Sequence, residues 1–394
     1  MKKLILATLV SAASISAAYA DGPTVYGKIN ASVDDVKSDL NSNREVSVDS
    51  NASRFGIKGS EKLTDNLSAI YQIEWGVAVD HNTLNANTDA NSNGSTADLT
   101  ARTRFIGLQY DGVGAIKIGR LDSNVKNLQY VNPSQGIDIL DDYVNGTFDT
   151  TQTFAGENRL DNVVAFETAK LNTSIGTLQG NFLISPSEKT VQEGKTGSTG
   201  STATSSSIIF TNRDLGLYTG IAYDSNIASY WNATSTFYKA TNAAVITPTK
   251  ATTNIFRWVG SADLGKLVGA SGLTFNALAQ QSKQTNLASG AIAPKETAYL
   301  LSADYNFKAL GLDALTAKLQ WQNATTSDLV TNGSDVKIDQ WGVDVDYAFS
   351  AKTKVYGFVA ERTIKNPNNP VVAANGYDQN YKYSAFGVGL EQKF

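Results

Sequence analysis

Apolar and polar residues alternate with a period of two along most of this chain, and that pattern limits the fold more than any other feature. The clearest segment covers residues 341–349, and its apolar members are Trp341, Val343, Val345, Tyr347 and Phe349. Successive side chains of a β-strand point to opposite faces, whereas a helix repeats its apolar face about every 3.6 residues. The chain is therefore predicted to be all-β, with strands that have one apolar and one largely polar face.

Sixteen segments carry this pattern. Most of them approach the length of about 9 to 11 residues that a tilted strand needs to cross a membrane. The segment 228–240 could form another strand, but we assign it to a long loop. The predicted strands lie near residues 24–34, 53–60, 66–77, 102–111, 114–121, 159–169, 177–184, 206–212, 216–225, 254–264, 272–284, 296–306, 314–324, 337–349, 353–363 and 382–394.

Short and long connections alternate between the predicted strands. Turns such as 61–65 and 112–113 are interleaved with long polar stretches at 35–52, 78–101 and 122–158. A transmembrane antiparallel barrel has short turns on its periplasmic side and long loops outside, and it therefore requires this rhythm. We predict a closed antiparallel β-barrel of about sixteen strands that spans a membrane.

A soluble β-sandwich is the alternative fold, because antiparallel sheets of any kind can alternate. Sixteen strands of this length would bury their apolar faces in an unusually large core. In a transmembrane barrel the apolar faces contact lipid and the polar faces line water, while closure leaves no unpaired edge in the hydrocarbon. The barrel is therefore the favoured fold.

The first twenty residues have the outline of a secretory signal peptide. Lys2 and Lys3 precede an apolar run from Leu4 to Ala18, and a small-residue pattern ends at Ala20. The apolar run is too short and too rich in Ala and Ser to span a bilayer. We therefore predict a cleaved signal peptide at 1–20 and a single barrel domain at 21–394, exported to the bacterial outer membrane.

Composition argues against several functions. The formal net charge is −4 and becomes −6 without Lys2 and Lys3, which argues against nucleic acid as a partner. The chain has no cysteine, so disulfides, thiol catalysis and thiolate metal sites are excluded. His81 is the only histidine, and nothing in the sequence places a nucleophile beside it. We therefore predict that the protein is not an enzyme and uses no cofactor.

Four stretches resemble the Gram-negative general porin family. They are VYGKIN at 25–30, SRFGIKGSEKL at 53–63, RFIGLQY through IKIGR at 104–120, and YSAFGVGLEQKF at 383–394. The resemblance implies a homotrimer in the outer-membrane lipid whose water-filled pore admits small hydrophilic solutes and ions by passive diffusion. It also implies that Phe394 belongs to the signal that the barrel-assembly machinery recognises.

Basic residues occupy the polar face of several predicted strands. Lys28, Arg54, Lys58 and Arg159 have the parity opposite to the apolar residues of their strands. Lys or Arg on the lipid face near the bilayer midplane costs about 2 to 4 kcal/mol, so these side chains are predicted to face the lumen. The family resemblance implies that Lys28, Arg54 and Arg159 belong to a ladder of basic residues on the pore wall.

The resemblance implies one further ladder residue from the strand that holds Arg102 and Arg104. Arg104, in the stretch TRFIGL, is the better match to the family. Both arginines share a parity with the apolar residues Ile106, Leu108 and Tyr110. A β-bulge or a contact between subunits would explain this pattern, and the sequence leaves both open.

Residues 122–158 form the longest connection and contain Asp138, Asp141 and Asp142. The resemblance implies that this third external loop folds into the barrel and that its carboxylates, Asp138 and Asp142 first, face the basic ladder. The PEFGG-like stretch of enteric members is absent, which leaves the path of the loop open. A Ca²⁺ site is the alternative interpretation of the acidic cluster, although its spacing does not match an EF-hand.

These features together predict a passive pore in which opposed charges at a constriction produce a transverse electric field. Overall composition does not decide between cations and anions, because the local charge balance at the constriction does. Two alternatives remain open. One is a substrate-selective porin with a solute-binding constriction, and the other is a non-conducting adhesin or surface anchor whose long loops bind other proteins.

Overall fold

The computed structural model describes residues 22–39, 43–80, 99–133, 136–140, 143–144, 148, 153–186, 202–227, 252–285, 293–327, 335–365 and 380–394. The predicted signal peptide, the segment 228–240, His81, Asp141 and Asp142 lie outside these residues. Predictions that concern them are therefore not addressed by the structure.

The described residues form one antiparallel sheet and a few short helices. The strands are β1 (Thr24–Ser38), β2 (Asn43–Ser50), β3 (Arg54–Lys62), β4 (Leu67–Val77), β5 (Leu99–Tyr110), β6 (Gly114–Asp122), β7 (Arg159–Thr168), β8 (Leu171–Thr173), β9 (Gly176–Ser185), β10 (Ala203–Asn212), β11 (Leu217–Ile227), β12 (Thr252–Asp263), β13 (Leu273–Thr285), β14 (Lys295–Asn306), β15 (Leu315–Ser327), β16 (Val336–Ala348), β17 (Thr353–Lys365) and β18 (Asn380–Lys393). The helices are α2 (Asn124–Asn127), η2 (Leu128–Tyr130), α4 (Leu264–Val268) and η4 (Phe307–Leu310).

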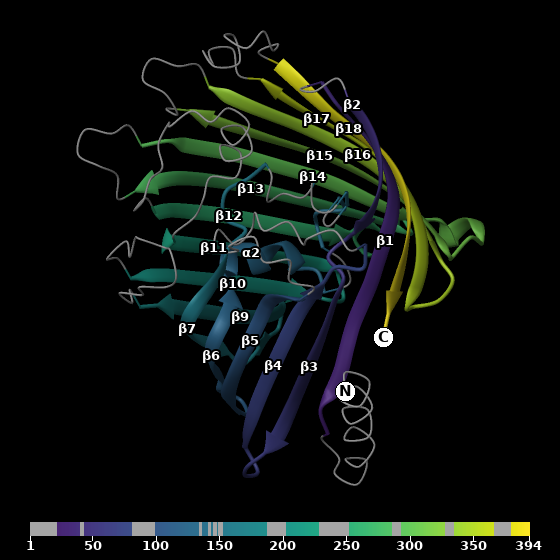
Figure 1. Ribbon diagram of the computed structural model, residues 1–394. Coiled ribbons are helices and arrows are strands. Elements are labelled where there is room, and N and C mark those ends of the chain that lie inside the picture. Colours follow the sequence, from purple (N-terminus) through teal and green to yellow (C-terminus); the bar gives the residue numbers. More distant parts are fainter. Residues whose placement is uncertain are drawn as a thin grey trace, which may run out of the picture.

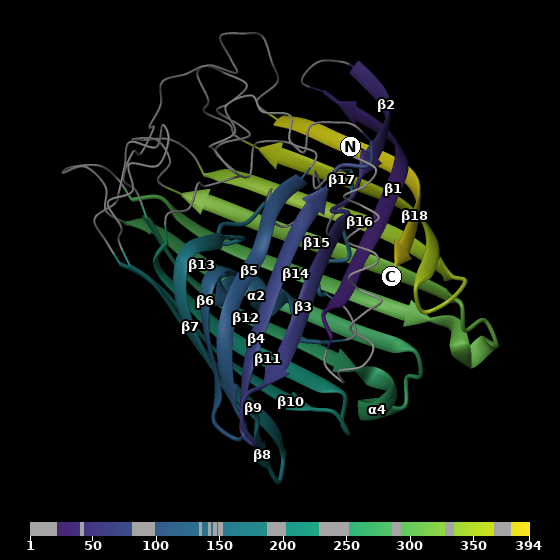
Figure 2. The same ribbon diagram turned by 60° about the horizontal axis from the view of Figure 1, so that its bottom comes forward.

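The sheet closes on itself, because β1 pairs with β18 on one side and with β2 and β3 on the other (Figures 1 and 2). β2 and β3 are two halves of one barrel strand, interrupted at 51–53, where Ala52 has a φ of 48°. β7 and β8 likewise both pair with β9. Once each of these pairs is taken as a single strand, the described residues form a barrel of sixteen strands, which confirms the predicted fold.

The two faces of the barrel wall are reversed relative to a soluble sheet. In β16 the apolar side chains of Trp341, Val343 and Val345 are exposed on the outside. Gln340 and Asp344, which have the opposite parity, are buried inside. An apolar exterior around a polar interior is the arrangement that a lipid bilayer requires, and it argues against the soluble sandwich.

The helices are short and lie in the connections. α4 and η4 belong to turns and end at Gly269 and Gly311, whose φ values of 79° and 74° lie in the left-handed region that favours glycine. Within the described part of the chain, no helix is long and apolar enough to cross a membrane.

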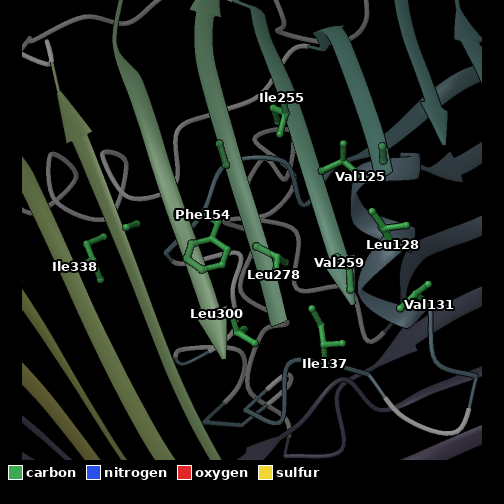
Figure 3. Close-up of a cluster of buried hydrophobic side chains, with 14 of the residues drawn as sticks. Val125, Leu128, Val131, Ile137, Phe154, Ile255, Val259, Leu278, Leu300 and Ile338 are labelled. Atoms are coloured by element: carbon green, nitrogen blue, oxygen red, sulfur yellow. The ribbon is translucent and has the colours of Figure 1, made fainter. Parts of the chain in front are cut away.

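The connection between β6 and β7 turns into the barrel. We call the described residues of the segment 123–158 the inner loop; α2 follows its first residue and lies within the barrel in Figure 1. Its apolar residues Val125, Leu128 and Phe154 are buried against inward-facing residues of the wall such as Val259 and Leu278 (Figure 3). The barrel therefore contains a small hydrophobic core, and the inner loop supplies one side of it.

Candidate pore constriction

Polar wall residues hold the backbone of the inner loop. The Ser302 hydroxyl donates to the Ile137 carbonyl at 2.6 Å, and the Gln340 amide donates to the Phe148 carbonyl at 2.6 Å. The Ile139 N–H donates to the Gln320 side chain at 2.7 Å. These wall residues belong to β14, β15 and β16. The loop therefore lies along one side of the interior and satisfies its backbone groups there.

Asp138 takes part in the same contact between loop and wall. Its carboxylate accepts hydrogen bonds from the Gln320 amide at 2.7 Å and from the Leu140 N–H at 3.0 Å. The residue is buried. Of the three predicted acidic residues, Asp138 is the one that the structure describes, and its side chain lies in the loop–wall contact.

The far part of the inner loop is held by an aromatic stack. The ring of Tyr143 lies 4.9 Å from that of Tyr356 and 4.6 Å from that of Phe358. Its hydroxyl donates to the Asp344 carboxylate at 2.9 Å. Burial, reinforced by the charge of Asp344, raises the pKa of Tyr143 well above its usual range. The hydroxyl therefore stays protonated and remains a hydrogen-bond donor.

Basic residues line the side of the barrel that faces the inner loop. Lys28 on β1 lies directly opposite Arg54 on β3 in the sheet register. The interior also receives Lys58 from β3, Arg102 from β5 and Arg159 from β7. The structure thus brings five predicted site residues to one wall, because β1 pairs with β3 and the strands β3 to β7 follow one another around the barrel.

Three of these basic residues have a carboxylate partner. Lys28 Nζ lies 3.6 Å from Glu391 Oε2, Arg102 Nε lies 2.6 Å from Glu74 Oε1, and Arg159 Nε lies 2.7 Å from Asp122 Oδ1. Each pair is largely shielded from solvent within the wall. Most of the positive charge of the ladder is therefore neutralised locally.

Arg54 and Lys58 differ from the other ladder residues. Neither of them forms an ion pair with a described residue within 4.0 Å. Lys58 Nζ lies 5.1 Å above the ring of Tyr26, whose hydroxyl donates to Glu74 at 2.9 Å. In the part of the wall that the structure describes, these two side chains therefore carry positive charge without a directly paired carboxylate, although Glu74 lies near enough to Arg54 for their charges to interact.

A β-bulge separates the two arginines of β5. Ile73 pairs with Arg104, but Trp75 pairs with Ala101, so β5 contains one extra residue at this point. The shift turns Arg102 inward to Glu74. Arg104 instead lies on the outer face, 5.7 Å from the ring of Trp75. The structure therefore turns Arg102, and not Arg104, toward the interior.

The profile of the Gram-negative porin family matches residues 6–367, which is most of the chain. The chain belongs to the Gram-negative porin family, the β-barrels of the bacterial outer membrane.

Curated relatives of this porin match a shorter segment. The major outer membrane protein P.IB of Neisseria meningitidis is 34% identical over 140 residues, which cover 34% of this chain and 38% of the relative. The outer membrane protein YedS of Escherichia coli is 30% identical over 128 residues, covering 30% of this chain and 32% of the relative. The matched segment thus spans about a third of the length of these relatives.

Solved structures match nearly the whole porin. An anion-selective porin from Comamonas acidovorans has a TM-score of 0.67 at 16% identity, and the match covers 95% of this chain and all of that one. OmpT of Vibrio cholerae in its trimer form has a TM-score of 0.59 at 12% identity, with the same coverage. Salmonella typhi OmpF in complex with daunomycin has a TM-score of 0.61 at 14% identity and is covered to 98%. These likenesses establish the shared fold.

The structure also reveals charged wall residues that sequence analysis did not single out. Lys318 Nζ lies 2.7 Å from both Asp344 and Asp346, and Lys354 Nζ lies 3.1 Å from Asp346. The sequence signal was their position on the polar face of β15, β16 and β17, which many other residues share. No group of three or more potential metal-ligating side chains occurs among the residues that the structure describes.

Proposed function

We propose that this porin forms a water-filled channel for passive diffusion of small hydrophilic solutes and ions across the bacterial outer membrane. The proposal rests on the observation that the inner loop and the basic residues occupy different sides of the barrel interior. The inner loop packs on the side formed by β10 to β18, and the basic ladder occupies the opposite wall. Charged and polar side chains from both sides face the interior, and such groups favour hydrated solutes over apolar ones.

We propose that Arg54 and Lys58 supply the part of the constriction field that attracts anions. Among the described residues, neither has a carboxylate within 4.0 Å, whereas Lys28, Arg102 and Arg159 each form such a pair. Fixed charges in a low-dielectric channel raise the local concentration of ions of opposite sign. Arg54→Ala should therefore shift the reversal potential in a salt gradient toward cation selectivity.

We also propose that the protein assembles as a homotrimer, with the outer face of β4 to β7 in a subunit contact. Arg104 lies directly opposite Arg120 on that face, and Arg120 is hydrogen-bonded to Asp161 at 2.6 Å. Six residues, or about 20 Å of strand, separate Arg104 from Tyr110 at the short-turn end. Arginines at this depth are costly in lipid. The trimeric form of the similar Vibrio cholerae OmpT supports this assembly.

Export and assembly complete the proposal. Residues 1–20 would direct the chain across the inner membrane and be cleaved. Phe394 would then be part of the signal recognised by the barrel-assembly machinery, and its side chain is exposed at the end of the last strand. The channel would act without a cofactor and would catalyse no reaction.

The deciding experiment is single-channel recording of the refolded mature protein in a planar bilayer, with the reversal potential measured in a salt gradient. Stepwise openings with a selectivity that moves toward cations in Arg54→Ala support the charged pore. Saturable block by one solute would favour the substrate-selective alternative. A correctly folded barrel without conductance would contradict the proposal and favour the adhesin or anchor alternative.

A further inference from the structure

Both ends of the inner loop meet at one buried arginine of the barrel wall. Arg257 lies in β12 with its side chain fully buried in the interior. Its Nη1 atom donates to the carbonyl of Val125, near the start of the loop, at 3.0 Å. The same atom lies 2.5 Å from the carboxylate of Glu157, near the end of the loop. One guanidinium therefore connects the two ends.

Neighbouring strands extend this contact. Arg257 Nε donates to the side-chain oxygen of Gln280 on β13 at 2.7 Å, and the Gln280 amide donates to the carbonyl of Ala155 at 2.7 Å. The Ala155 N–H donates to Glu296 on β14 at 3.1 Å. Arg257 Nη2 lies 3.5 Å from the Ala155 carbonyl, which adds a weaker contact. The end of the loop is thus attached to three adjacent strands.

The chemistry of this contact requires arginine. Its planar guanidinium donates in several fixed directions at once and keeps its charge when buried, whereas lysine offers a single ammonium group. Glu157 is almost completely buried, and Arg257 is its ion-pair partner. Removal of one member of a buried ion pair leaves the other charge without compensation, which is strongly unfavourable. Without Arg257, the Glu157 carboxylate would have a lower free energy in water than at the wall.

We propose that Arg257 is a positioning residue that keeps the constriction open and steady by holding both ends of the inner loop against β12, β13 and β14. The proposal rests on the proposed pore function, because it concerns the open space beside the loop. Arg257 lies beneath the loop and acts on passing solutes only through it. A loop that leaves these contacts would move from the wall toward the barrel interior, where the proposed pore lies.

The test compares single channels of the wild type with Arg257→Gln, Arg257→Lys and Glu157→Gln. We expect a severalfold increase in open-channel current noise and closure at lower voltage for Arg257→Gln and Glu157→Gln. The noise and closing voltage of Arg257→Lys should lie between those of these variants and those of the wild type. Lysine keeps the positive charge but lacks the planar guanidinium with its several donors. Lys266→Gln is the matched control, since α4 lies in a short turn away from the loop. Circular dichroism and the heat-dependent gel shift establish that each barrel has folded.

A disulfide can show that the loop is what moves. The chain has no cysteine, so two introduced cysteines can form a disulfide only with each other. A Cβ atom at Gly342 of β16 would lie 3.1 Å from Cγ of Leu140 in the loop, where a cysteine sulfur would sit. In the Arg257→Gln background, oxidation of Leu140→Cys/Gly342→Cys should return the noise toward the wild-type value. Reduction of the disulfide should raise the noise again.

The outcomes separate the two proposals. A silent wild-type barrel would overturn the pore function itself. A conducting wild type with unchanged noise and closing voltage in both Arg257→Gln and Glu157→Gln would overturn only the role of Arg257. Increased noise that does not respond to the disulfide would also overturn it, because the cause would then lie in the barrel and not in the loop.

Discussion

The ring of Phe394, the last residue, lies over the backbone of Gly27, where the first and last strands close the barrel. A Cβ atom at residue 27 would lie 2.5 Å from Phe394 Cζ and equally close to the backbone oxygen of Arg54. The two residues also exchange backbone hydrogen bonds of 3.1 and 3.2 Å. Glycine at 27 therefore allows the terminal aromatic ring to cover the seam of the barrel.

Gly27→Ala is expected to destabilise the barrel. The added methyl group must displace the Phe394 ring or the β3 backbone, and overpacking of this kind costs about 1 to 3 kcal/mol. The measurement is the urea midpoint of unfolding in detergent. Gly357→Ala is the control, because its Cβ would meet no atom closer than 3.7 Å. Equal midpoints for the two variants would show that the close contact at the seam is unimportant.

Glu74→Gln should make the channel more selective for anions. The change keeps the side-chain shape but removes the negative charge that lies 2.6 Å from Arg102 Nε. The wall around Arg102 would then lose one negative charge, and the net charge of the ladder would become more positive. The reversal potential in a salt gradient measures the shift.

Glu361→Gln provides the control for this prediction. Its pair with Lys382 is partly exposed, so solvent and salt screen the charge, and the selectivity should stay unchanged. A shift toward cations in Glu74→Gln would contradict the assignment of Arg102 to the pore wall.

Arg104→Ala distinguishes a subunit contact from a lipid-facing position by the sign of its effect. In a subunit contact, the substitution should weaken the trimer and lower its dissociation temperature on unheated gels. In lipid, loss of an arginine near the midplane should instead stabilise the barrel, by about 2 to 4 kcal/mol. Arg213→Ala, at a short turn, controls for loss of a positive charge elsewhere. A more stable barrel with an unchanged oligomer would refute the proposed contact.

Tyr143→Phe should loosen the far part of the inner loop. The ring stack on Tyr356 and Phe358 remains, but buried Asp344 loses a hydrogen-bond donor, which costs about 1 to 3 kcal/mol. Open-channel noise should increase. Tyr347→Phe, on the exposed outer face, should have no effect.

The alkaline pH dependence tests the same contact. Because burial raises the pKa of Tyr143, its hydroxyl keeps its proton above pH 10, where an ordinary tyrosine ionises. The difference in noise between the wild type and Tyr143→Phe should therefore persist above about pH 10. If the difference disappears near pH 10, the hydroxyl is not held as the structure indicates.

The β5 strand shows where a strict pattern fails. The sequence gives Arg102 and Arg104 the same parity as Ile106, and family resemblance favoured Arg104 as the ladder residue. One extra residue opposite the Ile73–Trp75 segment reverses the direction of Arg102 and leaves Arg104 outside. A bulge depends on the pairing between two strands, so β5 considered alone does not reveal it.

The wall beneath the inner loop shows a different limit. Ile255 and Phe256, Trp258 and Val259, and Leu300 and Leu301 are adjacent apolar pairs that interrupt the alternation. In each pair one member faces outward and the other is buried inside, where Ile255, Val259 and Leu300 form part of the core with the inner loop. Such pairs indicate that the inner face of a wall strand is covered by another segment, although they do not specify which segment covers it.

The sequence by itself determined most of the strands, their two faces and the approximate number of barrel strands. These features follow from local geometry, because successive side chains of a strand point in opposite directions whatever the rest of the chain does. The prediction of a long loop at 35–52 was wrong, because the end of β1 and the whole of β2 pair there as a hairpin. Only the tertiary structure decided that Arg102 and not Arg104 faces Glu74, that Asp138 contacts Gln320, and that Arg257 connects the two ends of the inner loop. Each of these relationships joins residues from separate strands or loops, and their distances are set by barrel closure and by the packing of the loop, which no single segment encodes.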